Sequence, residues 1–434
     1  MYRLEEKHDL VSIFSYKQTS AWISVKNFLT LARYNQNIRI GTKNKHDFFS
    51  FDGLKVLLIS IKNYVKQIFD KKQKNIFLGG STGVFIHNDR TIDAFFPYQI
   101  DRPADVSYML NCGNLRELAN HYDYIESNNI IIENYLVGPL KKIFSKIAVY
   151  FIGYDTKSKI KKFNGYLKQE NLTLPHKQLY KVYADFVVGY ELYRLFFKLL
   201  KIKKAYIVSA YTKPDIIAAL KSLNIHCTEI QHGIVGQLHR GYNYNFAFDP
   251  RLPAPDHINV YNRFWKDEIL KSLYFTDAQI SITGKLKYDI ANDNIKEAKE
   301  KYIVFTGQGG FVKDIISFFQ QSDTLLTSKN IVMFYKPHPR ETQEERILIK
   351  SSCNHLKSCF VYSGVSTAEE LIKHSIAHVS VFSACHFDAI HYKNKTYILN
   401  VMGDNIMDYY SEVYPEMYVK IKTMKELLKH ETLV

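Results

Sequence analysis

The chain has 434 residues, of which 46% are hydrophobic and 23% charged, which excludes a disordered or low-complexity scaffold and favours two domains. Lysine and arginine outnumber aspartate and glutamate by 58 to 43, and the net charge of +15 indicates an anionic partner such as nucleic acid, a membrane surface or a phosphorylated substrate. The five cysteines form no C-x-x-C pair, which is typical of a reduced cytoplasmic protein. We expect neither a signal peptide nor a membrane-spanning helix.

The first 200 residues are predicted to be mainly helical. Residues 1–75 have a basic, helical pattern, and helical periodicity returns from about residue 115 to 200. Between them, the apolar run at residues 76–78 is followed by glycines, which predicts a buried strand that opens into a loop.

After residue 204, strands and helices alternate in two series separated by a polar linker at 281–300. The first series has predicted strands at 205–209, 228–231 and 257–261, with helices at 213–222 and 263–273. The second has predicted strands at 302–305, 331–335, 360–361, 377–382 and 396–399, with helices at 312–319, 367–374 and 386–391. The pattern predicts an α/β fold with two doubly wound, Rossmann-like domains, residues 1–284 with helical additions and residues 285–434. The last helix is a candidate to pack back on the N-terminal domain.

One predicted turn combines two cations and an imidazole. Lys336, Pro337, His338, Pro339 and Arg340 directly follow the strand at 331–335. Ligands bind outside the carboxyl ends of parallel strands, and the two prolines restrict the loop, so this turn suits a phosphate. The alternative is a basic, proline-rich turn without a ligand.

Two further turns of the second half are candidate ligand sites. Ser383 begins a helix directly after a strand, where a hydroxyl and free amides can bind an anion, and Asp388 could accept from a ribose hydroxyl. For Ser383 the alternative is a simple N-cap. Gly307 and Gln308 lie in a glycine-rich turn that matches neither the dinucleotide nor the Walker motif. Close approach of the backbone to a ligand and a plain loop both remain open there.

Histidines near the strand ends of the first half are candidates for a general base. His232 follows the strand at 228–231, and His239 lies shortly after it. Asp215 lies in another strand-to-helix turn and could orient a base or serve as one, although an acid stabilised by the helix dipole is the alternative. The remaining histidines have no spacing typical of metal ligands, and we predict no metal site.

Several of these motifs together resemble a known family. Gln231, His232 and Gly233, the run from 239 to 242, Pro255 to Ile258 with Trp265, Thr283 with Gly284, and the Lys-Pro-His-Pro run at 336–339 resemble bacterial glycosyltransferases of the GT-B architecture. Those enzymes build capsule, O-antigen and lipopolysaccharide glycans. The resemblance covers residues 205 to 400 and implies two Rossmann-like domains facing a cleft, a nucleotide-sugar substrate, and no metal or other cofactor.

The His-Pro pair and the later serine are similar to transferases that use CMP-activated sugars, such as sialyl- and Kdo-transferases. This implies that His338 and Ser383 contact the donor phosphate. The first domain would present a polysaccharide or lipid-linked glycan acceptor. Such a protein is expected in the cytoplasm, with peripheral contact to the anionic inner membrane through the lysine-rich region before residue 75 and without nucleic acid.

The same motifs are also compatible with other activities. Ala384 stands where the CMP-sugar family has a second serine, and the paired acid of sialyltransferases is not visible. The pair Asp388 and Ala389 resembles the Glu-Ala of UDP-sugar enzymes, which keeps a UDP-sugar donor open. A CDP-glycerol-type phosphopolyol transferase shares the His-Gly and Lys-Pro-His-Pro motifs, and a nucleotide-sugar 2-epimerase-like isomerase has the same architecture.

Overall fold

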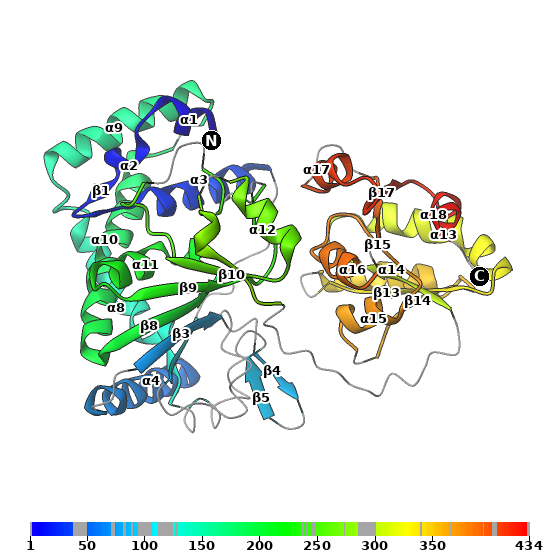
Figure 1. Cartoon of the computed structure of the whole chain (residues 1–434), viewed down its shortest axis with the longest axis horizontal. Coiled ribbons are helices and arrows are strands. Elements are labelled where there is room, and N and C mark those ends of the chain that lie inside the picture. Colours follow the sequence, from blue (N-terminus) through cyan, green and yellow to red (C-terminus); the bar gives the residue numbers. More distant parts are fainter. Residues whose placement is uncertain are drawn as a thin grey trace. The chain divides into compact units, whose positions relative to one another are not determined.

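The computed structural model of the chain describes residues 2–37, 50–70, 74–80, 84–87, 90–93, 106–111, 125, 129–172, 174–236, 238–239, 241–244, 249–272, 274–284, 301–338, 341–364, 366–393, 395–401 and 406–431 (Figure 1). Contacts divide the chain into two compact units, Met1–Asp289 and Ile290–Val434. Each unit contains one parallel sheet with helices on its faces. Within the described residues, no helix combines the length and the apolar character needed to cross a bilayer.

The N-terminal region is helical, as its sequence pattern predicts. Its elements are α1 (Tyr2–Lys7), α2 (Leu10–Ile13), the short hairpin of β1 (Ser15–Tyr16) and β2 (Thr19–Ser20), α3 (Trp22–Asn37) and α4 (Phe51–Phe69). A buried polar cluster anchors the start of α3. Glu5 accepts a 3.0 Å hydrogen bond from Trp22 Nε1 and pairs with Lys26 Nζ at 2.8 Å.

The first domain is built on a parallel sheet with the strand order β11-β10-β9-β8-β3-β6-β7. Its strands are β3 (Lys74–Gly80), β6 (Val106–Asn111), β7 (Ile131–Ile132), β8 (Ile202–Val208), β9 (His226–Ile230), β10 (His257–Val260) and β11 (Ile280–Ile282). The order runs outward in both directions from β3 and β8, which is the doubly wound arrangement. Residues 280–282 form an edge strand, so the predicted linker at 281–300 was wrong at its start. A separate antiparallel pair is formed by β4 (Val84–His87) and β5 (Arg90–Asp93).

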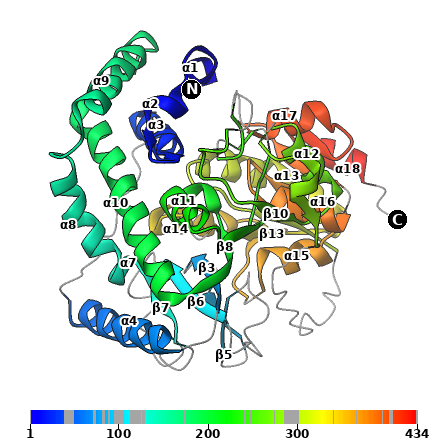
Figure 2. The ribbon, with the colours of Figure 1, turned by 60° about the vertical axis from the view of Figure 1, so that its left-hand side comes forward.

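Helices of the first domain pack on this sheet and on one another. They are α7 (Glu133–Leu136), α8 (Gly138–Ala148), α9 (Tyr154–Gln169), α10 (His176–Leu200), α11 (Pro214–Ser222) and α12 (Arg263–Leu270), with the short η3 (Ala210–Thr212) and η4 (Asp277–Gln279). The long α10 contacts α3, α4, α8, α9 and α11, and Figure 2 shows it running between α8 and the sheet. Its buried side is rich in aromatic residues, including Phe186, Tyr193 and Phe197.

The second domain repeats the doubly wound order in the sheet β14-β13-β12-β15-β16-β17. Its strands are β12 (Tyr302–Thr306), β13 (Val332–Lys336), β14 (Cys359–Val361), β15 (Ala377–Ser380), β16 (Thr396–Leu399) and β17 (Tyr418–Ile421). Its helices are α13 (Val312–Ser328), α14 (Gln343–Cys353), α15 (Ala368–His374), α16 (Cys385–Lys393), α17 (Ile406–Val413) and α18 (Met424–His430). The two sheets confirm the predicted pair of Rossmann-like α/β domains.

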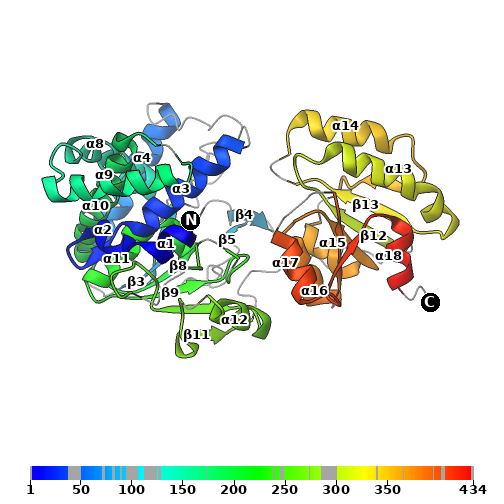
Figure 3. The same ribbon diagram turned by 90° about the horizontal axis from the view of Figure 1, so that it is seen from above.

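Figure 3 shows α13 and α14 on one face of the second sheet and α15 and α16 on the other. Phe305 and Tyr335 point to the first face and join a core with Phe319 of α13. The opposite face packs Tyr302 and Val304 against α15 and α16. The last helix, α18, buries Met424 and Leu427 in the core of this domain.

Candidate active site

The two sheets place candidate ligand sites at their switch points. In a doubly wound sheet, ligands bind outside the carboxyl ends of the strands where the strand order reverses. That point lies between β3 and β8 in the first domain and between β12 and β15 in the second. Ser209, directly after β8, has a φ of 57°, a left-handed conformation that residues other than glycine seldom adopt. This turn is the starting point of the first-domain group.

A buried carboxyl lies beside this turn. Glu229, in β9, is 0% exposed, and its Oε1 accepts hydrogen bonds from Ala210 N at 2.9 Å and from the Tyr242 hydroxyl at 2.5 Å. Burial raises the pKa of the Glu229 carboxyl to about 7, although both hydrogen bonds lower it. Glu229 therefore changes its charge near neutral pH.

Four rings form a contiguous cluster next to Glu229. The ring centroid of Tyr211 lies 6.2 Å from that of His232, 4.6 Å from that of His239 and 5.5 Å from that of Tyr242. His239 also lies 5.0 Å from Tyr242, and its Nδ1 accepts a 3.2 Å hydrogen bond from Gly241 N. The structure thus brings the two predicted histidines together on one aromatic residue.

His232 is the half-buried member of this cluster that follows β9. Burial, together with the nearby His239 and Lys213, lowers the pKa of its imidazole to about 4. The ring is therefore neutral at pH 7, the form in which an imidazole accepts a proton, and the lowered pKa makes it a weaker base than a free histidine. Gln231 fixes the loop, because its side chain donates to Gly233 O at 2.8 Å and accepts from Tyr261 N at 2.8 Å.

Gly241 is required by the packing of the ring cluster. A Cβ at this position would lie 2.4 Å from Cγ of Tyr211. Any larger residue would displace Tyr211 from its contacts with the histidines. This glycine therefore has a packing reason that the sequence motif alone does not show.

Asp215 does not join the histidines. Its carboxylate pairs with Lys141 Nζ of α8 at 2.5 Å. It also fills the space beside Gly189 of α10, where a Cβ would lie 2.0 Å from Oδ2. Asp215 is 6% exposed and belongs to the packing of three helices, and its role as a base stays a prediction.

The second domain gathers several predicted donor-binding residues at the ends of β12 and β13. Gly307 N donates to Lys336 O at 2.8 Å, which joins the two strand ends, and Gln308 lies half-buried in the same turn. Lys336 Nζ donates to Ser366 O at 2.7 Å and lies 4.9 Å from the ring centroid of Tyr362. Burial lowers the pKa of the Lys336 ammonium.

A buried acid supports the turn that contains His338. Oε1 of Glu341 accepts from the Tyr335 hydroxyl at 2.7 Å and from His338 N at 2.8 Å. A Cβ on Gly307 would lie 2.2 Å from this same carboxylate oxygen, so the glycine makes room for the acid. His338 is half-buried, and the predicted Pro339 and Arg340 lie outside the described residues.

Ser383 lies two residues before α16, in the turn between β15 and that helix. Its Oγ accepts a 3.2 Å hydrogen bond from Cys385 N, and the residue is 6% exposed. This bond orders the turn that leads into α16, and both the N-cap and the contact with a phosphate stay predictions. Asp388 lies half-buried in the first turn of the same helix.

A hydroxyl and imidazole network lies inside the second domain. Thr306 bonds His378 Nε2 at 2.9 Å, and Thr396 bonds Nδ1 of both His378 and His386 at 2.7 and 2.8 Å. Burial lowers the pKa of His386 to about 3 and that of His378 well below its usual value. Both imidazoles are neutral and part of the core. Among the described residues, no group of three or more histidines, cysteines or acids is arranged to hold a metal.

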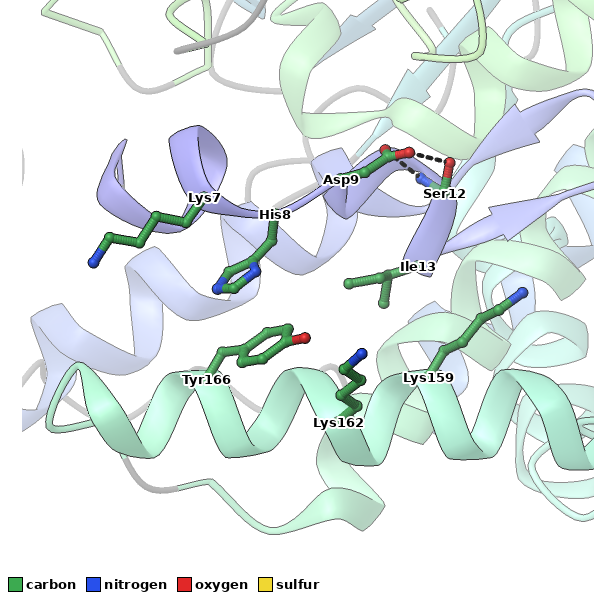
Figure 4. Close-up of a pocket in the computed structure, with 8 residues that line it drawn as sticks. All are labelled: Lys7, His8, Asp9, Ser12, Ile13, Lys159, Lys162 and Tyr166. Carbon is green, nitrogen blue, oxygen red and sulfur yellow. Dashed lines mark hydrogen bonds between the residues drawn. The ribbon is translucent and has the colours of Figure 1, made fainter.

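A pocket of about 360 Å³ lies elsewhere in the first domain, between the N-terminal helices and α9 (Figure 4). The His8 ring stacks on the Tyr166 ring with a centroid distance of 3.7 Å, and Ser12 N donates a hydrogen bond to Asp9 Oδ1. None of the site residues predicted from the sequence lines this pocket.

Sequence reasoning missed Glu229, Tyr242 and Glu341. For Glu229 a signal was present, because a single acid inside the apolar run before Gln231 and His232 is unusual for a buried strand. Tyr242 and Glu341 acquire their roles only through tertiary contacts.

No family model matches the sequence, and no curated protein matches it. Similar solved structures include UDP-GlcNAc 2-epimerase from Neisseria meningitidis bound to UDP-GlcNAc, with 9% identity, 82% of this chain and 92% of that chain covered, and a TM-score of 0.49. They also include the S. aureus MnaA-UDP co-structure, with 10% identity, 75% and 79% coverage and a TM-score of 0.43. MurG from Acinetobacter baumannii has 10% identity, 82% and 89% coverage and a TM-score of 0.41. Similarity at this level is too low for an activity or a substrate to be carried over.

Proposed function

We propose that this chain is a glycosyltransferase that moves a sugar from a nucleotide-activated donor to a hydroxyl of a cell-surface glycan or glycolipid acceptor. A CMP-linked ulosonic acid is the favoured donor and a UDP-sugar the second choice. The observation that carries the proposal is the group at the first switch point. There, His232 is neutral at pH 7 and belongs to the ring cluster. Tyr242 of the same cluster hydrogen-bonds the buried carboxyl of Glu229, whose pKa is about 7.

His232 is the proposed general base. An acceptor hydroxyl must lose its proton as it attacks the anomeric carbon, and a neutral imidazole is the form that takes it up. His232 keeps some exposed surface, whereas its Nδ1 is buried, so an acceptor would have to reach Nε2. His239, which packs on the same Tyr211 ring, is the second candidate.

Glu229 acts as a positioning residue in this proposal. It is fully buried and does not reach a substrate. Through Ala210 N and the Tyr242 hydroxyl, it fixes the turn after β8 and the ring that packs against His239. Its ionisation near pH 7 makes this arrangement dependent on pH.

The second domain is proposed to bind the donor at its own switch point. Lys336 and His338 would stabilise the negative charge of the leaving phosphate, with Arg340 on the same turn. Gly307, Gln308, Pro339, Ser383 and Asp388 complete the predicted donor site. In this scheme, cationic side chains rather than a metal neutralise the leaving group. A substrate of this kind, a nucleotide sugar, is expected in the cytoplasm, and we propose the same location for the protein.

The test is turnover of CMP-, UDP- and CDP-activated donors with and without glycan acceptors, followed by mass spectrometry. We expect an elongated glycan from one donor and loss of the product in His232→Ala. His226→Ala is the matched control, because this exposed histidine lies at the opposite end of β9. Conversion of a nucleotide sugar without an acceptor would assign an isomerase instead, and full activity of His232→Ala would refute the proposed base.

A further inference from the structure

Helix α4 turns a mixed face toward the protein, in which Ser60, Asn63 and Gln67 are buried beside Val56 and Ile59. Asn63 Nδ2 donates to Ile125 O at 3.1 Å and to Ile130 O at 2.8 Å. Ser60 Oγ accepts from Ile132 N at 3.2 Å, and Gln67 Nε2 donates to Asn129 O at 2.6 Å. These hydrogen bonds, together with the burial of Val56 and Ile59, hold α4 in place.

The opposite face of α4 is apolar and exposed. Its residues recur every three or four positions and therefore lie in one line along the helix. We call this line the apolar stripe, and it consists of Phe51, Leu54, Leu58, Ile61, Val65 and Phe69. The exposed fraction is 84% for Phe51, 58% for Leu58 and 79% for Phe69. Leu54, Ile61 and Val65 are 52%, 41% and 43% exposed, so the stripe is an exposed apolar surface along its whole length.

Lysines accompany the apolar stripe. Lys55, Lys62 and Lys66 each follow a stripe residue directly and are exposed along one border of the stripe. Asp52 is the single acidic residue of α4. A helix that combines an apolar face with a basic border is typical of helices that lie in the interface of an anionic lipid bilayer.

A second exposed apolar region lies on α8 and at the start of α9. Ile143 and Ile147 of α8 are 56% and 50% exposed, and the aromatic residues Tyr150, Phe151 and Tyr154 are more than 80% exposed. Aromatic side chains prefer the headgroup level of a membrane. Both α4 and α8 contact α10, and they lie on the same side of the first domain in Figures 1, 2 and 3.

We propose that α4, together with the corner between α8 and α9, docks in the plane of an anionic phospholipid surface. The stripe would enter the boundary between headgroups and acyl chains, and the lysines would contact lipid phosphates. A second copy of the chain is the less suitable occupant, because it would bring lysine borders of the same sign together. The inference is independent of the reaction proposed above.

The test is flotation of the full chain with phosphatidylcholine vesicles that do or do not contain phosphatidylglycerol. We expect binding to the anionic vesicles that weakens with salt. Leu58→Asp with Val65→Asp should weaken it by more than about tenfold. Ile347→Asp with Leu348→Asp, at positions of α14 that are 57% and 56% exposed, is the matched control and should bind as the wild type does.

Charge reversal provides a second variant that leaves the stripe intact. Lys62→Glu with Lys66→Glu should weaken binding about fivefold or more for each lysine, whereas Lys350→Glu should not. Failure of the folded wild type to bind anionic vesicles, or equal binding by the stripe variant, overturns the proposal. Self-association of the wild type that Leu58→Asp with Val65→Asp abolishes, without vesicle binding, assigns the face to a second copy and also overturns it. Vesicle binding needs no donor or acceptor, so either result leaves the proposed function untouched.

Discussion

The hydroxyl of Tyr242 donates a 2.5 Å hydrogen bond to Oε1 of Glu229, a carboxyl with no exposed surface. Two opposing effects meet in this pair. Burial disfavours the charged carboxylate, whereas the hydrogen bonds from Tyr242 and Ala210 N favour it. Because the pKa lies at about 7, small changes at this site alter the charge of Glu229 under ordinary conditions.

Replacing Tyr242 by phenylalanine should raise the pKa of Glu229 further. A hydrogen bond to a charged group contributes about 1.5–3 kcal/mol, so its loss should move the acidic limb of the kcat/KM profile upward by about one pH unit or more. The measurement is the pH dependence of donor turnover in Tyr242→Phe. Tyr302→Phe is the control, since it loses a comparable hydrogen bond to Leu371 O in the second domain. A profile identical to that of the wild type would contradict the assigned role of Glu229.

The same carboxyl should make the first domain less stable as the pH rises. The folded pKa of about 7 lies above the ordinary 4.5, so the folded state keeps its proton between these values while the unfolded state loses it. Stability should therefore fall by about 3 kcal/mol from pH 4.5 through pH 7, and Glu229→Gln should remove this part of the dependence. Urea unfolding at several pH values, followed by tryptophan fluorescence, checks this. Both tryptophans, Trp22 and Trp265, belong to the first domain. A Glu229→Gln curve parallel to that of the wild type would count against the raised pKa.

Gly307→Ala should damage the second switch point. The new Cβ would lie 2.2 Å from Glu341 Oε1 and 2.4 Å from the Tyr335 hydroxyl, so the acid that holds the His338 turn must move. We expect a loss of about 1–3 kcal/mol in stability, together with weaker nucleotide binding. Gly309→Ala is the control, because its Cβ would meet Glu345 only at 3.7 Å. Calorimetric titration and thermal unfolding of both variants test this, and similar behaviour of the two would contradict it.

Asp215→Asn should reduce stability without removing the chemistry. It breaks the ion pair with Lys141, whose side chain is 29% exposed, and we expect a loss of about 1–3 kcal/mol. The turnover number of the folded variant should stay close to that of the wild type, whereas His232→Ala should lose turnover at nearly unchanged stability. Thermal unfolding and steady-state kinetics separate the two effects. Loss of turnover in a stable Asp215→Asn protein would restore Asp215 as a catalytic candidate.

Local sequence pattern was sufficient for the central strands of both sheets and for the strand ends that carry the candidate sites, but β6, β7 and β17 were not predicted. The apolar runs at 302–305 and 331–335 are long and buried, and they appear as β12 and β13. The helix α14 was not predicted, because its sequence is mostly polar and buries only Ile349 and Cys353. The edge strand β11 was assigned to the linker because it has only three residues.

The roles of individual polar residues depended on contacts that spacing does not reveal. Asp215 forms an ion pair with Lys141, which lies 74 residues earlier in the chain. Glu229 was passed over although it lies within a predicted strand, and only the place of β9 in the sheet shows that its carboxyl is buried and its pKa raised. His232 and His239 were predicted because a histidine after a buried strand is informative by itself. The Tyr211 ring that both histidines contact was not predicted.

The central claim, that a nucleotide-activated donor binds at the second switch point, is tested most directly by thermal unfolding with CMP, UDP, CDP, GDP and ADP. The wild type, His338→Ala and the exposed control His355→Ala are compared. A nucleotide present at about 100 times its dissociation constant stabilises the fold by about 2.7 kcal/mol. We expect one nucleotide, CMP before UDP, to raise the unfolding temperature of the wild type and of His355→Ala but not that of His338→Ala. Absence of a shift with every nucleotide, or an equal shift in His338→Ala, would contradict the account.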